Sequence, residues 1–347
     1  MKIRFLSALF LSVCAFSVHA LQFTVNNIVY EADPSSAPHN CQVSGLLSKD
    51  LSGYLEVPSS VSFEGLDYEV TSLGDYAFSY ASSLSGISLP ETIRELPRFA
   101  FYGCSSLSDF SAGEIFDIGD FAFYGCASLE SFRFTKSLRS IGEQAFTLCR
   151  SLNVDTITGS DLVVGPYAFS HCYALKEVSF AGVSEIGEEA FSNCMGLVSL
   201  SFDDSIFRIR ERAFRGSEAI NEVRCLRKTP PFLAFTAFSD AVYKTATLIV
   251  PDGRRLLYMQ TPPWNEFMHF LEVAVKGVKA EEASTFSAYV SGGVLSIHGP
   301  EGWLRVFSAD GRLLYSDRKK EDMVSLSLTS PGVYVILLDN QTLKIKN

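Results

Sequence analysis

The chain has 347 residues, of which 47% are hydrophobic and 20% are charged, and its formal net charge is −10. This hydrophobic fraction is that of a protein with a packed core, so the composition excludes a largely disordered chain. The acidic balance argues against a nucleic-acid-binding protein, because contacts to phosphate need a basic surface. At roughly 150 residues per domain, the length is enough for about two domains.

Residues 1–20 are predicted to be an export signal. Lys2 and Arg4 form a basic start, an apolar stretch follows, and a cleavage site with small residues ends at Ala20. Removing the two cations takes the formal charge from −10 to −12. The apolar stretch is too short to span a bilayer, and no later run of 18 apolar residues occurs. Two alternatives stay open: a buried first strand, and lipidation of Cys14.

Residues 21–70 are predicted to form β-hairpins. Hydrophobic and polar residues alternate over Phe23–Tyr30, Tyr54–Val57 and Val61–Val70. Alternation with period two is typical of strands that bury one face. We expect these hairpins to cap the apolar end of the array that follows them.

Residues 71–240 contain an internal repeat of about 23 residues. The dipeptide Ala-Phe recurs eight times, and successive phenylalanines are 22 to 24 residues apart. We call these residues the repeat phenylalanines and count other positions from them. They are Phe78, Phe101, Phe123, Phe146, Phe169, Phe191, Phe214 and Phe238.

Other positions recur in phase with the repeat phenylalanine. The residues around Leu84–Leu89 alternate in polarity, and their counterparts in later repeats predict one short strand per repeat. The segment Ile118–Phe123 (Ile-Gly-x-x-Ala-Phe) has helix-like spacing and predicts a short helix or 3₁₀ turn. One such repeat cannot bury its own apolar side, so we expect the repeats to stack into a solenoid with a continuous core.

The third residue after the repeat phenylalanine is cysteine in five repeats: Cys104, Cys126, Cys149, Cys172 and Cys194. We expect these side chains to be buried free thiols that satisfy the backbone of the turns. Disulfides remain an alternative in an exported chain.

The unit Ile-Gly-x-x-Ala-Phe-x-x-Cys-x-x-Leu-x-x-Ile-x-Leu-Pro resembles the BspA-like leucine-rich repeat of bacterial surface proteins. The resemblance covers about residues 71–240 and implies a leucine-rich repeat solenoid. It weakens at both ends, where Pro97 and Arg210 replace the glycine of the unit. Residues 241–277, with a strand at Leu248–Pro251, resemble the C-terminal closure of such solenoids.

A linker rich in Ala, Glu and Ser is predicted at 278–287, and residues 288–347 are predicted to form a small all-β sandwich. Asp310-Gly311 is a typical hairpin turn between two of its strands. Val306–Gly311, Gly332–Val335 and Leu343–Lys346 resemble motifs of the C-terminal sorting domain of type IX secretion cargo. This resemblance implies export to the outer cell surface of a Bacteroidetes-like bacterium, with removal of the module as an open possibility.

The sequence contains none of the common catalytic or nucleotide-binding motifs, and its five histidines have no partner at metal-ligand spacing. Carboxylate pairs such as Glu188-Glu189 fall in predicted turns, where solvated side chains are expected. We therefore expect no enzyme activity, no cofactor and no metal.

Two surfaces are candidates for binding. Outward positions of the predicted strands carry small polar residues together with Arg133 and Arg224. A second set is aromatic and lies two residues before or one residue after the repeat phenylalanine: Tyr76, Phe99, Phe121, Tyr167, Tyr102 and Tyr124. Interface hot spots favour tyrosine. The alternatives are a solvated sheet with no ligand, and rings that only pack along the solenoid.

These observations favour an exported, monomeric repeat protein at the cell surface that binds an extracellular macromolecule without catalysis. The family resemblance implies adhesion to a protein. The alternative is glycan capture in a polysaccharide-uptake system, in which the aromatic rings would stack on sugars.

Overall fold

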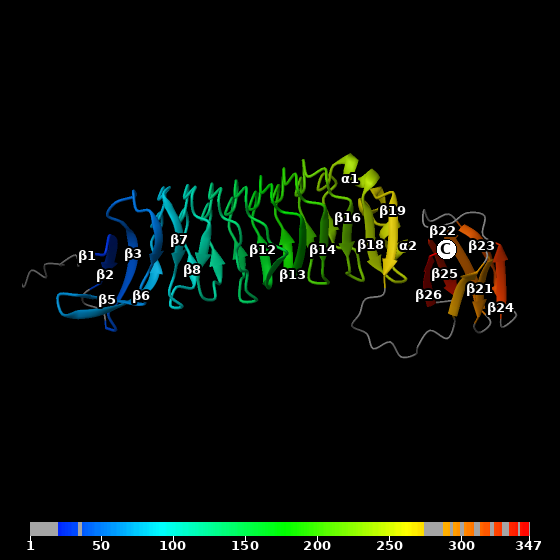
Figure 1. Cartoon of the computed structure of the whole chain (residues 1–347), viewed down its shortest axis with the longest axis horizontal. Helices are drawn as coiled ribbons and strands as arrows, with labels where there is room; N and C mark the ends of the chain where they lie inside the picture. Colours follow the sequence, from blue (N-terminus) through cyan, green and yellow to red (C-terminus); the bar gives the residue numbers. More distant parts are fainter. Residues whose placement is uncertain are drawn as a thin grey trace, which may run out of the picture. The chain divides into compact units, whose positions relative to one another are not determined.

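The computed structural model describes residues 20–33 and 37–273, together with seven strands between Ser287 and Lys346. The chain divides into two compact units, residues 1–273 and 274–347. Figure 1 shows the first unit as a row of stacked coils, coloured blue to yellow. The predicted export signal at 1–20, apart from Ala20, and the predicted linker at 278–287, apart from Ser287, lie outside the described residues.

The first unit begins with a five-stranded sheet in the order β1-β2-β3-β6-β5. Neighbouring strands are antiparallel except β3 and β6, which are parallel. Phe23, Tyr30 and Tyr68 are buried on the sheet and belong to the same core as the repeats. The strands are β1 (Leu21–Val25), β2 (Ile28–Ala32), β3 (Asn40–Leu46), β5 (Ser60–Phe63) and β6 (Leu66–Leu73).

Lys49, in the segment after β3, completes the hydrogen bonding of the first coil. Its Nζ donates to the carbonyl oxygen of Ala77 at 3.3 Å. In the later coils the equivalent alanine carbonyl accepts the N–H of the repeat phenylalanine one coil earlier, at 2.7–2.8 Å. The first coil has no repeat before it, so a lysine side chain supplies the missing donor. Burial lowers the pKa of this lysine.

Each coil has three sides, which we call the strand side, the short-strand side and the turn side. Strands in neighbouring coils pair in parallel. β12 (Thr156–Val164) and β13 (Glu177–Ile186) bend and contribute to the first two sides. The strand side contains β4 (Gly53–Glu56), β7 (Leu84–Ser88), β9 (Asp109–Ser111), β14 (Ser199–Phe202), β16 (Glu222–Cys225), β18 (Thr247–Pro251) and β19 (His269–Val273). The predicted strand of the third repeat is absent: residues 129–134 form none, so β4-β7-β9 is a sheet separate from the larger one. The short-strand side contains β8 (Glu95–Leu96), β10 (Asp117–Ile118), β11 (Ser140–Ile141), β15 (Arg208–Ile209) and β17 (Phe232–Leu233).

The turn side carries the repeat phenylalanine and is built from β-turns, where the sequence had predicted a short helix or 3₁₀ turn. Hydrogen bonds between residues three apart are present, as from Ala77 N–H to the Gly74 carbonyl at 3.2 Å. The second residue before the repeat phenylalanine has a φ of 51° to 61° in the first seven repeats. This left-handed conformation is the third position of a type II turn and stops a regular helix.

The repeat phenylalanines form a continuous stack inside the solenoid. Successive rings lie 4.9–5.5 Å apart between centroids, with interplanar angles of 5° to 16°. Their side chains are at most 3% exposed. Because each repeat offers the same ring at the same place, every coil buries the apolar face of its neighbour. The predicted continuous core is confirmed.

The cysteines at the third position after the repeat phenylalanine are buried and free. Each thiol donates to the carbonyl of the repeat phenylalanine in the preceding coil, at 3.0–3.1 Å. Ser217 takes this position in the seventh repeat and makes the same bond at 2.8 Å. The predicted role of these side chains in satisfying turn backbone is confirmed.

Glycine in the repeat unit marks a corner at which neighbouring coils touch. A Cβ added to Gly142 would lie 2.5 Å from the backbone nitrogen of Asp120, and one added to Gly165 would lie 2.7 Å from the Ile141 carbonyl oxygen. Such contacts are too short for any side chain, so the close approach of the coils requires glycine.

The last coils of the solenoid are closed by α1 (Asp240–Thr245), α2 (Arg255–Met259) and the 3₁₀ helix η1 (Trp264–Glu266). The Trp264 indole is fully buried and donates to the Pro231 carbonyl at 2.8 Å. The strand predicted at Leu248–Pro251 is present as part of β18. No helix among the described residues is long and apolar enough to cross a membrane.

The second unit contains two antiparallel sheets, β20-β21-β24 and β23-β22-β25-β26. Leu295, Ile297, Leu304, Val306 and Ile336 form its core, so the two sheets make the small sandwich that the sequence predicted. The turn predicted at Asp310-Gly311 lies outside the described residues, between two strands that do pair. The strands are β20 (Ser287–Ser291), β21 (Val294–His298), β22 (Gly302–Ser308), β23 (Leu313–Lys319), β24 (Met323–Ser327), β25 (Val333–Leu338) and β26 (Gln341–Lys346).

Candidate binding surfaces

The aromatic residues of the first three repeats form one patch on the turn side, which we call the aromatic ladder. Tyr76, Phe99 and Phe121 lie two residues before their repeat phenylalanines. Tyr76 stacks on Phe99 at 4.5 Å and Phe99 on Phe121 at 4.8 Å, each at an interplanar angle of 5°. Tyr76 is 51% exposed, and the other two rings are half-buried. In the fourth repeat Gln144 takes this position, and the stack ends.

A second column of rings lies beside the first. Tyr102 and Tyr124 stack at 4.9 Å, and both are half-buried. They contact the first column through Phe99 at 5.7 Å and Phe121 at 5.9 Å. Burial and the neighbouring tyrosines raise the pKa of Tyr102. The two columns therefore form a single surface.

Tyr80 also belongs to the aromatic ladder, although the sequence did not point to it. It is 63% exposed and contacts the Tyr102 ring edge-on at 5.3 Å. A Cβ on Gly103 would lie 3.1 Å from the Tyr80 ring, so the glycine leaves room for the tyrosine. Tyr80 is the only aromatic residue at the second position after a repeat phenylalanine, so no periodic signal reveals it.

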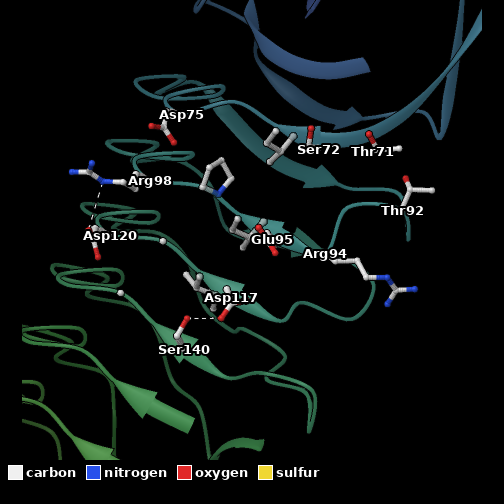
Figure 2. A pocket seen from close by; sticks show the side chains of 16 residues that line it. Thr71, Ser72, Asp75, Thr92, Arg94, Glu95, Arg98, Asp117, Asp120 and Ser140 are labelled. Carbon is white, nitrogen blue, oxygen red and sulfur yellow. Dashed lines mark hydrogen bonds and ion pairs between the residues drawn. The ribbon is translucent and has the colours of Figure 1, made fainter. Parts of the chain in front are cut away.

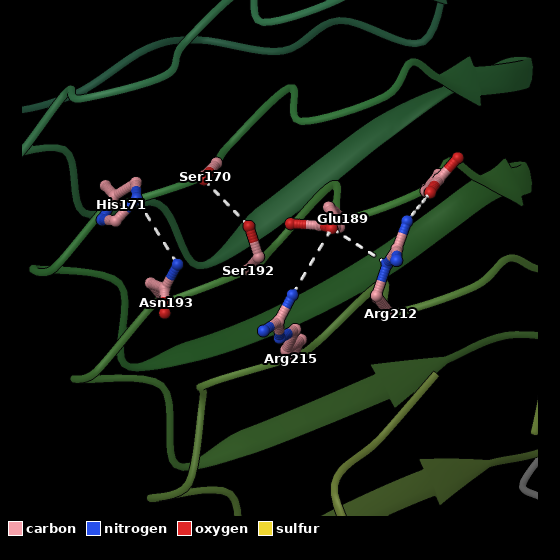
Figure 3. A network of polar contacts seen from close by, with 8 residues as sticks. Ser170, His171, Glu189, Ser192, Asn193, Arg212 and Arg215 are labelled. Atoms are coloured by element: carbon pink, nitrogen blue, oxygen red, sulfur yellow. Dashed lines mark hydrogen bonds and ion pairs between the residues drawn. The ribbon is translucent and has the colours of Figure 1, made fainter. Parts of the chain in front are cut away.

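Tyr167 is separated from the aromatic ladder and lies in a polar part of the turn side. Burial and the carboxylates of Glu189 and Glu188 raise its pKa. Figure 3 shows this region, in which Arg212 Nε lies 2.9 Å from Glu189 Oε1 and Arg215 Nη1 lies 3.9 Å from the same oxygen. In the sixth and seventh repeats, the ion-paired Glu189 and Arg212 thus take the position that rings occupy in the first three.

The arginines predicted as binding residues lie on a different side of the solenoid. Arg133 and Arg224 belong to the strand side, at the tenth position after the repeat phenylalanine. Arg133 is exposed, whereas Arg224 is half-buried and lies 3.7 Å from Glu222. The eight predicted residues therefore lie on two faces of the solenoid, which correspond to the two surfaces distinguished in the sequence.

A shallow groove crosses the short-strand side of the first four repeats (Figure 2). Two of its charged groups pair with each other, Arg98 with Asp120 at 3.6 Å, and Asp117 pairs with Arg139 beside the groove. Ser140 Oγ also donates to Asp117 at 2.6 Å. Among the residues that the structure describes, no three His, Cys, Asp or Glu side chains are placed to hold a metal ion.

A second exposed aromatic surface, not recognised from the sequence, lies at the other end of the short-strand side. Phe207, Phe232 and Phe235 are 57%, 56% and 70% exposed. The Arg208 guanidinium lies 5.8 Å from the Phe207 ring and 6.0 Å from the Phe232 ring. The Arg227 guanidinium lies 5.8 Å from the Phe207 ring. We call these five residues the Phe–Arg patch.

The fold of the first unit is that of a leucine-rich repeat solenoid. The family described as "BspA type Leucine rich repeat region" matches in six copies over residues 59–153 and 110–221. The repeat array is thus similar to the BspA-type leucine-rich repeat over residues 59–221.

Several solved structures are similar to the chain. The T. pallidum leucine rich repeat protein TpLRR is 26% identical, with 58% of this chain and 91% of that chain covered at a TM-score of 0.48. A leucine rich cell surface protein from Faecalibacterium prausnitzii A2-165 is 17% identical, with coverages of 67% and 89% and a TM-score of 0.37. The pneumococcal vaccine antigen PcpA is 13% identical, with coverages of 74% and 100% and a TM-score of 0.34. No curated protein sequence matches significantly.

Proposed function

We propose that this chain is exported to the outer cell surface, where its solenoid binds an extracellular protein through the aromatic ladder. The observation that carries the proposal is the continuity of six partly exposed rings on the turn side of the first three repeats. Monomeric proteins seldom leave a connected set of large aromatic rings exposed without a partner. Tyrosine combines apolar area with a hydroxyl group, which suits a protein interface. The proposal assigns no catalytic step, no cofactor and no metal to the chain.

The stacking of the rings supports a protein partner over the glycan alternative. A sugar binds an aromatic side chain by lying against the open face of its ring. Phe99 has Tyr76 on one face and Phe121 on the other, so both of its faces are covered. A ring that is stacked on both faces can therefore contact a partner only through its edge. Edges suit edge-to-face contacts with aromatic side chains and close contacts with peptide carbonyls.

The binding test compares two sets of tyrosine variants. Replacing Tyr76, Tyr80 and Tyr102 by alanine should weaken binding by at least about 2 kcal/mol, which is the scale of hot-spot aromatics. Tyr173 is an exposed tyrosine on the turn side outside the aromatic ladder, and Tyr173→Ala is the matched control. Both proteins are applied to arrays of immobilised extracellular proteins and of glycans, and their melting temperatures are measured on the same samples.

The two ligand arrays separate the two candidate functions. Binding to a protein that is lost in the triple variant and kept in the control supports the proposal. Glycan binding that depends on the same tyrosines would favour the capture alternative. An affinity that the triple variant retains per folded molecule would remove the aromatic ladder as the site and leave the polar strand side with Arg133 and Arg224.

The second part of the proposal concerns export. We infer that residues 288–347 act as a type IX sorting module, since they fold as a compact unit apart from the solenoid and carry the motifs noted above. Deleting them should leave the solenoid folded but retained in the periplasm. Cell fractionation and protease accessibility of whole cells measure this, and normal surface display of the truncated chain would contradict the sorting role.

A further inference from the structure

The Phe–Arg patch combines three exposed phenylalanines with two guanidinium groups. Phe207 and Phe232 lie on neighbouring coils, and the Phe232 N–H donates to the Phe207 carbonyl at 3.0 Å. Phe235 lines a shallow hollow together with Phe232 and Pro262, so the three rings belong to one area. Each ring is more than half exposed, although phenylalanine has no polar group that would favour contact with water. Such a patch points to an apolar or amphiphilic partner.

The cations of the patch are available to an anion. Arg208 has Glu185 as its ion-pair partner, at a distance of 3.7 Å, and that carboxylate is also paired with Arg210. The Arg227 guanidinium donates to the backbone carbonyls of Asp204 and Ile206, at 3.0 and 2.9 Å, which leaves its charge uncompensated. Both guanidinium groups therefore keep positive charge beside the exposed rings.

Charge is distributed unevenly along the solenoid. Residues 205–255 contain ten Lys or Arg and five Asp or Glu, a net charge of +5. Residues 21–204 contain eight Lys or Arg and 24 Asp or Glu, a net charge of −16. An anionic surface would consequently attract the segment that holds the Phe–Arg patch and repel the earlier repeats.

We propose that the Phe–Arg patch binds the surface of a membrane that contains anionic phospholipids. The guanidinium groups would pair with lipid phosphates, and the three phenyl rings would enter the boundary between headgroups and acyl chains. This combination of basic and apolar side chains is what peripheral membrane binding requires. The solenoid would then be held by its C-terminal repeats while the acidic repeats with the aromatic ladder stay away from the lipid.

The exposure of the rings favours a lipid surface over an acidic peptide. A peptide-binding site usually buries its aromatic residues in a groove, where they contact the peptide on several sides. Here the rings are 56–70% exposed. Exposed rings can enter a fluid interface, which adapts to their shape.

The short-strand side also provides a matched control. In the earlier repeats, Phe116 lies between Arg94 and Arg139, whose guanidinium groups are 5.3 and 5.5 Å from its ring. In this second arginine–phenylalanine cluster, as in the Phe–Arg patch, one arginine is paired with a carboxylate, here Arg139 with Asp117. The cluster differs from the patch in that its ring is half-buried. Changes in this cluster alter the same residue types on the same side without touching the Phe–Arg patch.

The test is flotation of the full chain with vesicles. Binding is measured in 50 mM and in 500 mM salt, because the higher salt concentration screens the attraction between charges. One vesicle preparation contains equal parts of phosphatidylglycerol and phosphatidylcholine, and the other contains phosphatidylcholine alone. Three proteins are compared with the native chain: F207S/F232S/F235S, R208Q, and the control F116S/R94Q. All share residues 1–20, so any contribution of that apolar segment is equal, and circular dichroism verifies that each variant is folded.

We expect the native chain to bind the anionic vesicles, and to bind them more weakly at the higher salt concentration. The triple serine variant should bind at least about tenfold more weakly, R208Q about fivefold more weakly, and the control as well as the native chain. Three results would overturn the proposal: no binding to the anionic vesicles, equal binding by the folded triple variant, or an equal loss in the control. Retention by an immobilised poly-glutamate peptide without binding to vesicles would identify an acidic polypeptide as the partner instead, and would also refute the lipid assignment.

Discussion

Replacing Phe146 by alanine tests whether the stack of repeat phenylalanines holds the solenoid together. The ring is fully buried and lies 5.1 Å from both Phe123 and Phe169, with the edge of Phe132 also at 5.1 Å. Removing a buried phenylalanine side chain costs about 3–5 kcal/mol. Each aromatic pair stabilises the fold by about 0.5–1.5 kcal/mol beyond the effect of burying apolar area. We therefore expect the free energy of unfolding to fall by an amount in the upper part of that range, about 4–5 kcal/mol.

The position of Phe146 in the array predicts how the variant unfolds. Each coil contacts mainly its two neighbours, so a defect in the fourth repeat weakens the coupling between the two halves of the solenoid. Urea unfolding followed by circular dichroism should then show two transitions where the native chain shows one. Hydrogen exchange should locate the earlier transition next to the fourth repeat.

Phe238→Ala is the matched variant at the end of the array. Its ring stacks on Phe214 at 4.9 Å, and Tyr243 and Phe267 close its other side at 5.8 and 5.6 Å. We expect a smaller loss, about 3 kcal/mol, and a single transition because no coupling between halves is broken. Equal losses at both positions, or a single transition in both variants, would refute the distinction between central and terminal repeats.

Three further outcomes follow from the contacts between coils. Burial raises the pKa of Cys194 to about 12, so its thiolate stays negligible at pH 8–9 and iodoacetamide should modify it only on unfolding, as mass spectrometry can show. Cys149→Ser should cost about 1–2 kcal/mol in urea unfolding, because a hydroxyl group can make the bond that Ser217 makes in the seventh repeat; a larger loss would contradict that equivalence. Gly142→Ala should lower the free energy of unfolding by about 2–3 kcal/mol. Gly74→Ala should leave the melting temperature nearly unchanged, because its Cβ would lie 3.4 Å from the nearest atom, the Val43 carbonyl oxygen.

The sequence predicted the core well because a solenoid gives every residue of one column the same surroundings. The repeat phenylalanines, the cysteines and the leucines around Leu84 each recur at a fixed distance, and the structure buries all of them. The prediction that residues 288–347 form an all-β unit was also correct, since strands are described there from β20 to β26. The first of these strands begins at Ser287, the last residue of the predicted linker, whose Ala, Glu and Ser composition gave no strand signal.

The conformation of the turn side could not be predicted from residue type. The left-handed position is occupied by Tyr76, Gln144, Glu189 and Arg212, among others, although glycine or asparagine is the usual choice there. In the solenoid the neighbouring coils fix that conformation. The Tyr76 N–H, for example, donates to the Arg98 carbonyl one coil later, at 3.2 Å. A bond between residues 22 positions apart leaves no local signal in the sequence.

The candidate surfaces show a complementary limit of repeat analysis. Columns that recur in every repeat describe packing, because only packing is the same in every coil. A binding surface is local, so its residues are the departures from the columns: Tyr80, where the other repeats have Gly, Leu, His, Asn or Asp, or Phe232, where most of them have polar side chains. The part of the aromatic ladder that recurs from repeat to repeat is therefore visible in the sequence, whereas the Phe–Arg patch, which does not recur, is not.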